Sequence, residues 1–335
     1  MKNVLVTGVA GFMGSHLADA FLSKGYSVTG IDNLIGGYRS NVPKGVKFYE
    51  IDLNNLEDLE GAFKGIDIVI HAACTAYEGL SVFSPALVVR NTMQITATVM
   101  SMSVKSGVSK IIYLSSMARY GTQENQPFTE DMIPKPQDPY GIAKYSSELL
   151  VKNICETHNM DYVILVPHNI IGPRQKYDDP YRNVASIMTN RMLQGKQPII
   201  YGNGEQIRCF SFMQDVVDPC VVAAESSKIN RVVINVGPDE DFITINQLAK
   251  QLAVILDFKL DPIYMPSRPK EVFHATCSAN LARELLGYET STTLGAGLIE
   301  LVGWIKGMGA KPFSYHLPLE FITEATPKSW TDKLM

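Results

Sequence analysis

A tyrosine and a lysine four residues apart, Tyr140 and Lys144, have the types and spacing of an acid–base pair. On a helix this spacing stacks both side chains on one face, one turn apart. A phenol with a pKa of about 10 is a weak base at neutral pH, but a neighbouring ammonium favours the phenolate and lowers that pKa. Ser116, at the end of an apolar run, would hydrogen-bond the same substrate hydroxyl. These residues predict proton transfer at a hydroxyl group, whereas an ordinary Tyr–Lys pair on a surface helix is the alternative.

Three glycines near the start of the chain suit the binding of a dinucleotide. Gly8, Gly11 and Gly14 follow an apolar run and open a stretch with helical spacing. The first permits a sharp turn, the second lets the backbone approach a pyrophosphate, and the third lets the helix pack closely on the strand. Asp32, which ends the next apolar run, is placed to accept hydrogen bonds from a ribose 2′-hydroxyl, which favours NAD over NADP. The pattern predicts NAD binding, and a close-packed turn without a ligand is the alternative.

The elements that must position these groups alternate along the chain. Short apolar runs typical of buried strands are separated by stretches with helical spacing. Strands are expected at residues 4–6, 26–31, 46–51, 67–71, 110–115 and 162–166. Helices are expected at residues 13–21, 56–63, 85–106 and 140–158. This alternation predicts the α/β fold class, with a doubly wound parallel sheet (Rossmann) and helices on both of its faces.

The sequence changes in character after Val166, where prolines interrupt longer loops. We expect an NAD-binding Rossmann domain at residues 1–166 and a smaller, mainly substrate-binding lobe at residues 167–310. Residues 231–236 again have the composition of a core strand, so the lobes are expected to be interleaved, with this strand returning to the sheet. Residues 311–335 form a C-terminal extension that is too apolar for a free tail. We expect it to pack across its own subunit.

Composition and charge exclude several kinds of protein. The 335 residues are 46% hydrophobic and 19% charged, with a formal net charge of −4, which indicates no general attraction to nucleic acid or membranes. The five cysteines and six histidines show no C-x-x-C or H-x-x-x-H spacing, so we expect neither a disulfide framework nor a metal site. A strand that begins at residue 4 leaves no room for a cleavable signal peptide, and no apolar run is as long as a membrane span. We therefore expect a cytoplasmic protein.

Further motifs extend from Met1 to about Trp304 and carry a family resemblance. They are Asp32-Asn33-Leu34, Asp52-Leu53, His71-Ala72-Ala73, Ser116 to Tyr120-Gly121, Asn169-x-x-Gly172-Pro173-Arg174, Tyr201-Gly202-x-Gly204-x-Gln206-x-Arg208, Asp215, Arg268-Pro269 and Leu285-Leu286-Gly287-Tyr288. With these motifs the chain resembles the extended short-chain dehydrogenases/reductases, in the NAD-dependent nucleotide-sugar epimerase/dehydratase family, and is similar to its UDP-glucose 4-epimerase-like members.

The resemblance implies a cofactor site and a substrate site. Cofactor contacts are implied for Gly8, Gly11, Phe12, Met13, Gly14, Asp32, Asn33, Asp52, Leu53, Ala72, Ala73, Asn91, Tyr140 and Lys144. Substrate contacts are implied for Ser81, Ser116, Asn169, Arg208, Arg268, Glu271 and Ala275. Asp52 and Leu53 would flank the adenine, and Lys144 would also hold the nicotinamide ribose. Arg208 and Arg268 would bind the substrate diphosphate, because the planar fork of arginine matches phosphate oxygens.

The activity implied by the resemblance is NAD-dependent epimerisation of a nucleotide-diphosphate sugar at C4, with a UDP-sugar as substrate and a homodimer as the assembly. Tyr140 would take the proton of the 4-hydroxyl, and the sugar would pass through a transient 4-keto intermediate. Met117 and Ala118 stand where dehydratases and decarboxylases of the family carry an acidic residue, which argues against loss of water or of a carboxylate. A nucleotide-sugar reductase or dehydrogenase and a non-catalytic NAD-binding regulator are the alternatives.

The resemblance also concerns the size of the sugar. Ala275 lies seven residues after Arg268, at a position that gates the C2 substituent of the sugar in related 4-epimerases. A small side chain there would admit an N-acetyl group. As alternatives, His274 or residues 166–168 refill the space, or the register differs by one residue.

A polar stretch at residues 174–183 has the composition of a loop that contacts a sugar. Its paired carboxylates, Asp178 and Asp179, are more typical of a solvated turn than of a metal site. We therefore expect both to face solvent.

Overall fold

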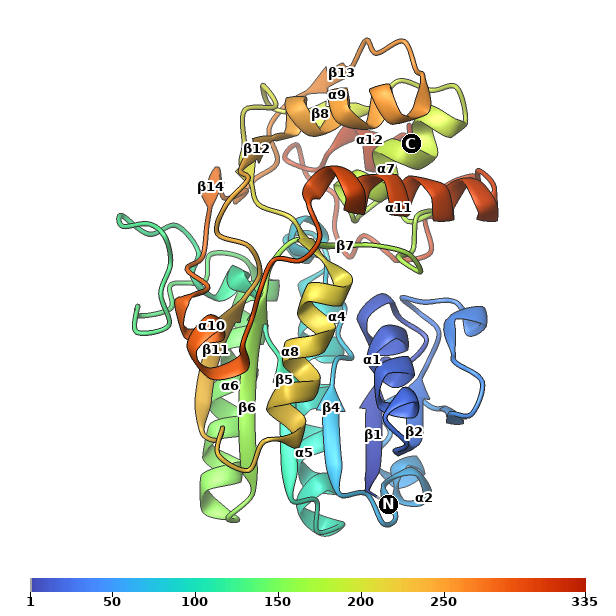
Figure 1. Ribbon diagram of the computed structural model, residues 1–335. Helices are drawn as coiled ribbons and strands as arrows, with labels where there is room; N and C mark the ends of the chain where they lie inside the picture. The colour runs from blue at the N-terminus through green and yellow to red at the C-terminus, as the bar shows by residue number, and fades with distance from the viewer. Residues whose placement is uncertain (1) are drawn as a thin grey trace.

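The computed structural model describes residues 2–335. Its centre is a parallel sheet with the strand order β11-β6-β5-β4-β1-β2-β3 (Figure 1). The strands are β1 (Asn3–Thr7), β2 (Ser27–Asp32), β3 (Lys47–Glu50), β4 (Ile68–His71), β5 (Lys110–Leu114), β6 (Asp161–Pro167) and β11 (Val232–Val236). In this register Val6 lies opposite Gly30 of β2 and Ile70 of β4. The chain runs outward from β1 in one direction and from β4 in the other, which confirms the predicted doubly wound fold.

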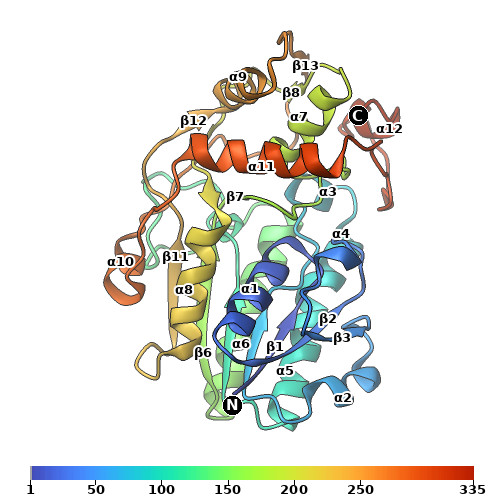
Figure 2. The ribbon, with the colours of Figure 1, turned by 45° about the vertical axis from the view of Figure 1, so that its right-hand side comes forward.

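Helices cover both faces of the sheet (Figures 1 and 2). One face carries α1 (Phe12–Ser23), α8 (Met213–Glu225) and α10 (Asn280–Leu286), and the other carries α2 (Glu60–Phe63), α5 (Ile95–Lys105) and α6 (Pro139–Thr157). Successive side chains of a strand point to opposite faces, so Val4 and Val6 pack with α1 and α8 while Leu5 packs with the helices of the other face. Because both faces are buried, the strands are continuous apolar runs in the sequence.

A smaller lobe lies beyond the carboxyl ends of the strands (Figure 1). Its elements are β7 (Ile170–Ile171), α7 (Val184–Leu193), β8 (Ile199–Tyr201), β9 (Ile207–Arg208), β10 (Ser211–Phe212), β12 (Ile243–Thr244), α9 (Ile245–Leu256), β13 (Ile263–Met265), β14 (His274–Ala275) and α11 (Leu294–Met308). Met188 of α7, Leu252 of α9 and Leu301 of α11 share one buried apolar cluster. Between β10 and β12 the chain returns to the sheet as α8 and β11, so the two parts are interleaved. The domain boundaries given above stay a prediction.

Two of the expected helices are interrupted. The helix expected at residues 56–63 begins as the 3₁₀ turn η2 (Leu56–Leu59) and continues as α2. Residues 85–106 form α4 (Pro85–Val89), a π-helical turn η3 (Arg90–Gln94) and α5. The interruption centres on Asn91, whose backbone leaves helical geometry and which lines the cavity at the carboxyl ends of the strands. Such turns often occur at functional sites. The remaining short elements are η1 (Arg39–Asn41), α3 (Glu78–Ser81), η4 (Met117–Arg119) and α12 (Lys328–Thr331).

The C-terminal extension packs against its own chain. Leu317, Trp330 and Met335 are buried in one cluster with Phe83 and Tyr181. Aromatic rings dominate this cluster, and the rings of Trp330 and Tyr181 meet nearly edge-on with centroids 5.2 Å apart. The extension is therefore an ordered part of the molecule.

Three further findings concern membranes, thiols and metals. No helix within residues 2–335 is both long and apolar enough to cross a membrane. The five cysteines are all free thiols. Within the same residues, no group of three or more His, Cys, Asp or Glu side chains is arranged to hold a metal ion.

Candidate active site

One cavity of about 420 Å³ holds almost all of the predicted site residues. It runs along the carboxyl ends of β1, β2, β4 and β5 and reaches residues of the smaller lobe, among them Tyr201 of β8 and Arg208 of β9. Of the predicted site residues, only Ser81 and Ala275 do not line it. Ligands of doubly wound sheets bind in the crevice outside the carboxyl ends of the strands, where the strand order reverses. The cavity occupies this crevice.

The glycine turn, residues 8–14, brings the start of α1 close to the end of β1. Gly8 has a φ of 72° and donates its N–H to the carbonyl of Ile31 at 2.8 Å. A Cβ on Gly14 would lie 2.0 Å from the Gly8 carbonyl oxygen, so only glycine allows this approach. Gly11 is the N-cap of α1, no side chain caps the helix, and no acidic residue lies in its first turn. The free N–H groups of this helix end suit an anionic pyrophosphate.

Backbone N–H groups fix the carboxylate of Asp32 at the end of β2. Its Oδ2 accepts from the N–H of Ala10 at 3.0 Å, and its Oδ1 accepts from the N–H of Leu34 at 2.7 Å. Burial raises the pKa of this carboxyl, while the backbone N–H groups lower it. Held in this way, the carboxylate keeps acceptor capacity for ribose hydroxyls. The glycine turn, the uncapped helix end and Asp32 together fit NAD, and these residues would hold it.

Tyr140 and Lys144 lie together on α6. The helix begins at its N-cap Asp138, whose Oδ1 accepts from the N–H of Gly141 at 2.9 Å. Tyr140 is 6% exposed and Lys144 is 2% exposed, so the alternative of a surface Tyr–Lys pair is wrong. The Lys144 Nζ donates to the carbonyl of Leu114, at the end of β5, at 2.6 Å. The ammonium is therefore fixed between the helix and the strand end.

Two opposing effects act on the Tyr140 phenol. Burial raises its pKa, and so does the neighbouring Cys74, whereas the Lys144 ammonium and the Ser116 hydroxyl lower it. The sequence predicts a lowered pKa from Lys144 and a nicotinamide cation acting together. Burial is the largest of these effects, so with Lys144 alone the pKa of the phenol lies above its ordinary value. A positive charge beside the phenol would lower this pKa.

Two arginines of the smaller lobe share one carboxylate partner. Glu271 Oε1 lies 2.9 Å from Arg268 Nη2 and 3.7 Å from Arg208 Nη2. Burial raises the pKa of Glu271, but Arg268 and Arg208 outweigh it and hold this pKa below its ordinary value. The side chains of Arg208 and Arg268 are only 14% and 26% exposed, so they are not free surface charges. Two cations with one anion leave a net positive charge, which suits a diphosphate.

Comparison with known proteins agrees with this geometry. Residues 4–237 match the NAD dependent epimerase/dehydratase family. The chain belongs to this family.

Three solved structures are among those similar to this chain. A UDP-glucose 4-epimerase from Thermotoga maritima, solved with UDP-glucose, is 34% identical with a TM-score of 0.87, over 91% of this chain and 99% of that one. A UDP-N-acetylglucosamine 4-epimerase from Methanobrevibacter ruminantium, solved with UDP-N-acetylmuramic acid, is 32% identical with a TM-score of 0.84, over 92% and 99%. A UDP-glucuronic acid 4-epimerase from Bacillus cereus, solved with UDP-glucuronic acid and NAD, is 28% identical with a TM-score of 0.83, over 91% and 99%.

Ser81 and Ala275 are the two predicted substrate residues of this family member that lie away from the cavity. Ser81 is fully buried, and its Oγ donates to the Glu78 carbonyl at 2.6 Å. Ala275 lies opposite Arg208 in the pairing of β14 with β9, and it packs into the apolar cluster of the α5 and α6 face. This placement does not support a gate beside the sugar, and neither residue enters the proposal below.

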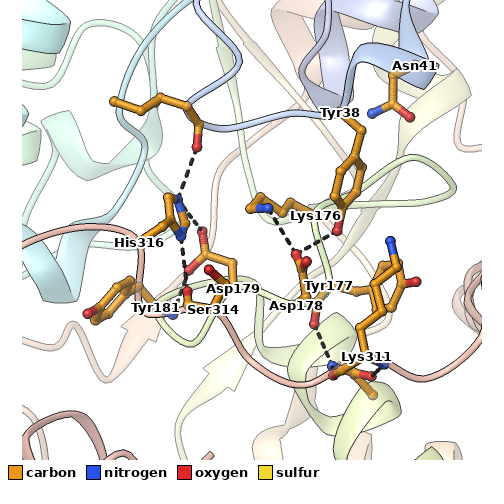
Figure 3. A network of polar contacts seen from close by, with 12 residues as sticks. Tyr38, Asn41, Lys176, Tyr177, Asp178, Asp179, Tyr181, Lys311, Ser314 and His316 are labelled. Carbon is orange, nitrogen blue, oxygen red and sulfur yellow. Dashed lines mark hydrogen bonds and ion pairs between the residues drawn. The ribbon is translucent and has the colours of Figure 1, made fainter.

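Asp178 and Asp179 do not lie at a solvated turn, so that expectation is wrong. Asp179 is fully buried, and its Oδ2 accepts a hydrogen bond of 2.5 Å from the hydroxyl of Tyr77. Asp178 accepts the hydroxyl of Tyr38 at 2.6 Å and pairs with Lys176 at 3.0 Å (Figure 3). Both tyrosines come from the Rossmann half of the chain, and the extension joins the same network. The loop is therefore a bridge between the two lobes rather than a free surface segment.

Several cavity residues were missed by sequence reasoning. They are, among others, Cys74, Glu78, Arg182, Tyr201 and Met335. Cys74 and Glu78 lie in the segment that follows β4, three and seven residues after His71, and the carboxyl end of a central parallel strand is where such residues reach a ligand. Their position after a predicted strand was the available indication. Arg182 belongs to the polar stretch at residues 174–183 that was expected to contact a sugar, although it was not singled out. No local pattern indicated the place of Met335.

Proposed function

We propose that this protein is an NAD-dependent 4-epimerase of a UDP-linked sugar. The observation that carries the proposal is the presence of Tyr140, Lys144 and Ser116 in one cavity with Arg208 and Arg268. A nucleotide sugar in this cavity would contact the proposed proton-transfer groups and the proposed diphosphate-binding groups together, which supports the proposal. Similar proteins named as 4-epimerases of UDP-glucose, UDP-N-acetylglucosamine and UDP-glucuronic acid support it.

The chain supplies proton transfer, orientation and exclusion of water. Bound NAD supplies an acceptor that takes a hydride and later returns it. The Tyr140 phenolate takes the proton of the sugar 4-hydroxyl, and the Ser116 hydroxyl hydrogen-bonds the same oxygen. After the 4-keto sugar has turned its other face to the site, Tyr140 returns the proton. One proton and one hydride leave the sugar and both come back, so the reaction is redox-neutral.

Turning the sugar without releasing it requires a firm hold on the nucleotide diphosphate. Arg208 and Arg268 offer planar guanidinium groups for phosphate oxygens, and Glu271 holds Arg268 in place through the 2.9 Å contact. The sugar is linked to this fixed diphosphate by single bonds, so it can rotate while the nucleotide stays bound.

The residues after Ser116 favour epimerisation over elimination or decarboxylation. Met117 and Ala118 are buried apolar side chains in the short helix η4. Neither can move a proton, whereas loss of water needs an acid near the leaving group. The reductase or dehydrogenase alternative is left for experiment, because it uses the same Tyr140 and Lys144.

The decisive experiment is turnover of UDP-glucose and UDP-N-acetylglucosamine without added NAD, followed by product chromatography and by absorbance of NADH. We expect interconversion of the 4-epimers without accumulation of NADH, and NADH formed in proportion to product would indicate a dehydrogenase. Tyr140→Phe is expected to lower kcat by at least about 100-fold while NAD still binds. Tyr145→Phe, on the same helix but outside the cavity lining, is the matched control.

We also propose a homodimer formed through α4, η3 and α6. Val89, Met93, Ile142 and Leu149 are apolar residues of these neighbouring segments and are 37–49% exposed. A second copy of the chain would cover them. Light scattering of Leu149→Glu is expected to show a monomer, and Ile299→Glu on α11, which is 60% exposed, is expected to leave the dimer intact. A monomeric wild type would contradict the proposal.

A cytoplasmic location is proposed on the state of the thiols. All five cysteines are free, and free thiols persist in reducing compartments. Cell fractionation followed by thiol alkylation tests this, and recovery from an oxidising compartment would contradict it.

A further inference from the structure

Glu78 places a carboxylate in the cavity wall that the proposed mechanism does not use. It is the first residue of α3, the short helix that follows β4. Its carbonyl oxygen accepts from Ser81 Oγ, but its carboxylate has no hydrogen-bond or ion-pair partner within residues 2–335. Glu78 is an exposed residue, and it lines the cavity. A ligand in the cavity therefore meets an unpaired carboxylate.

The neighbours of α3 indicate which part of the substrate Glu78 faces. A Cβ on Gly79 would lie 3.3 Å from Arg268 Nη1. Ser81 Oγ, at the other end of α3, lies 3.4 Å from Oδ1 of Asp138, the N-cap of the helix that carries Tyr140. Burial and then Asp138 raise the pKa of Glu78, to about 7, whereas Arg208 and Arg268 lower it. Its own charge in turn raises the pKa of Tyr140. Glu78 thus interacts both with the acid–base residue and with the two diphosphate-binding arginines. The part of a nucleotide sugar that lies between its C4 hydroxyl and its diphosphate is the sugar ring, so Glu78 faces the sugar.

The other ionic groups near this point already have partners. Glu271 is bonded to Arg268, and Asp138 caps α6. The guanidinium of Arg182 lies over the ring of Tyr77 at 4.8 Å, and the buried Asp179 balances its charge. Arg208 also lies 3.7 Å from Glu271. The unpaired group at the sugar position is therefore Glu78, and it is negative above a pH of about 7.

We propose that Glu78 is a specificity residue that selects sugars without a carboxylate. Neutral hexoses and N-acetylhexosamines have O–H or N–H groups that donate hydrogen bonds to the Glu78 carboxylate. A uronic acid adds a second carboxylate, and the two negative charges repel each other. The inference rests on the proposed function and deepens it. The similar 4-epimerases act on UDP-linked glucose, N-acetylglucosamine and glucuronic acid, and Glu78 selects the first two substrate classes for this chain.

The experiment compares the wild type with Glu78→Gln, which removes the charge at constant shape, and Glu78→Asp, which keeps the charge. The measured quantities are kcat/KM and the calorimetric Kd for UDP-glucose, UDP-N-acetylglucosamine and UDP-glucuronate. The wild type is expected to favour UDP-glucose over UDP-glucuronate by at least about tenfold in both. Glu78→Gln is expected to shrink this ratio by at least about tenfold, and Glu78→Asp is expected to retain it.

An unchanged ratio in Glu78→Gln, or a wild type that binds both sugars equally, would overturn the proposal. The binding constants separate it from the proposed function. If no sugar is epimerised but the wild type still discriminates in Kd and Glu78→Gln does not, the role of Glu78 stands and the epimerase assignment fails. Thermal melting verifies folding of each variant, and Glu78→Ser replaces Glu78→Gln if the latter does not fold.

Discussion

Trp330 holds the C-terminal extension against the rest of the chain, and its removal is expected to be costly. Its side chain is 3% exposed. The ring meets Phe83 and Tyr181 edge-on, with centroids 6.0 Å and 5.2 Å apart. Its Nε1 has no hydrogen-bond partner within the described residues, so Trp330→Ala removes packing and no hydrogen bond.

The magnitude follows from this packing. Truncating a buried tryptophan to alanine costs about 3–5 kcal/mol of unfolding free energy, of which each aromatic pair contributes about 0.5–1.5 kcal/mol. Tyr181 and Met335 belong to the same cluster and also line the cavity. A loosened extension would therefore enlarge the substrate site, and the KM for the nucleotide sugar is expected to rise together with the loss of stability.

Chemical denaturation measures the effect, with Trp304 as the remaining fluorescent reporter. Ile322→Ala is the matched control, because Ile322 lies in the same extension but is 65% exposed and should change the unfolding free energy by less than about 0.5 kcal/mol. A loss below about 1 kcal/mol for Trp330→Ala, or equal losses for both variants, would refute the view that the extension is an integral part of the fold.

Two further predictions concern the cofactor turn and acid stability. Gly14→Ala would place a Cβ 2.0 Å from the Gly8 carbonyl oxygen, so calorimetry should detect no NAD binding, whereas Gly61→Ala, with no atom within 4 Å, should bind NAD like the wild type. His71 has its pKa lowered from 6.5 to about 3 by burial and by Lys144, so its neutral form contributes stability that is present above pH 6.5 and is lost as the pH falls. Between pH 6.5 and 5 this amounts to about 2 kcal/mol in denaturation experiments, and an equal pH slope in His71→Gln would contradict the assignment.

Local chemistry made much of the site predictable. Gly14 and Asp32 follow from what a strand–turn–helix unit needs, and the spacing of Tyr140 and Lys144 follows from helix geometry alone. Asp179 was mistaken because its burial depends on Tyr77, which is 102 residues away in the sequence, and no local pattern reports such a contact.

Long-range pairing also explains why Ala275 does not line the cavity. Counting from Arg268 gave its place along the chain, but the pairing of β14 with β9 decides where its side chain points. A short strand that begins after a loop can shift by one residue, and such a shift moves every side chain to the other face. Position along the sequence is therefore not enough to place a gate.

The interleaving of the two lobes has a thermodynamic consequence. The chain leaves the sheet after β6, returns as α8 and β11, leaves again, and returns once more as α10 before α11. No single cut separates the lobes, because removal of the upper part would take the edge strand β11 from its place beside β6. The two parts are then expected to melt as one cooperative unit, and a ligand that binds only one of them stabilises both. A nucleotide held at the glycine turn would thus protect the distant sugar-binding loops from proteases, without touching them.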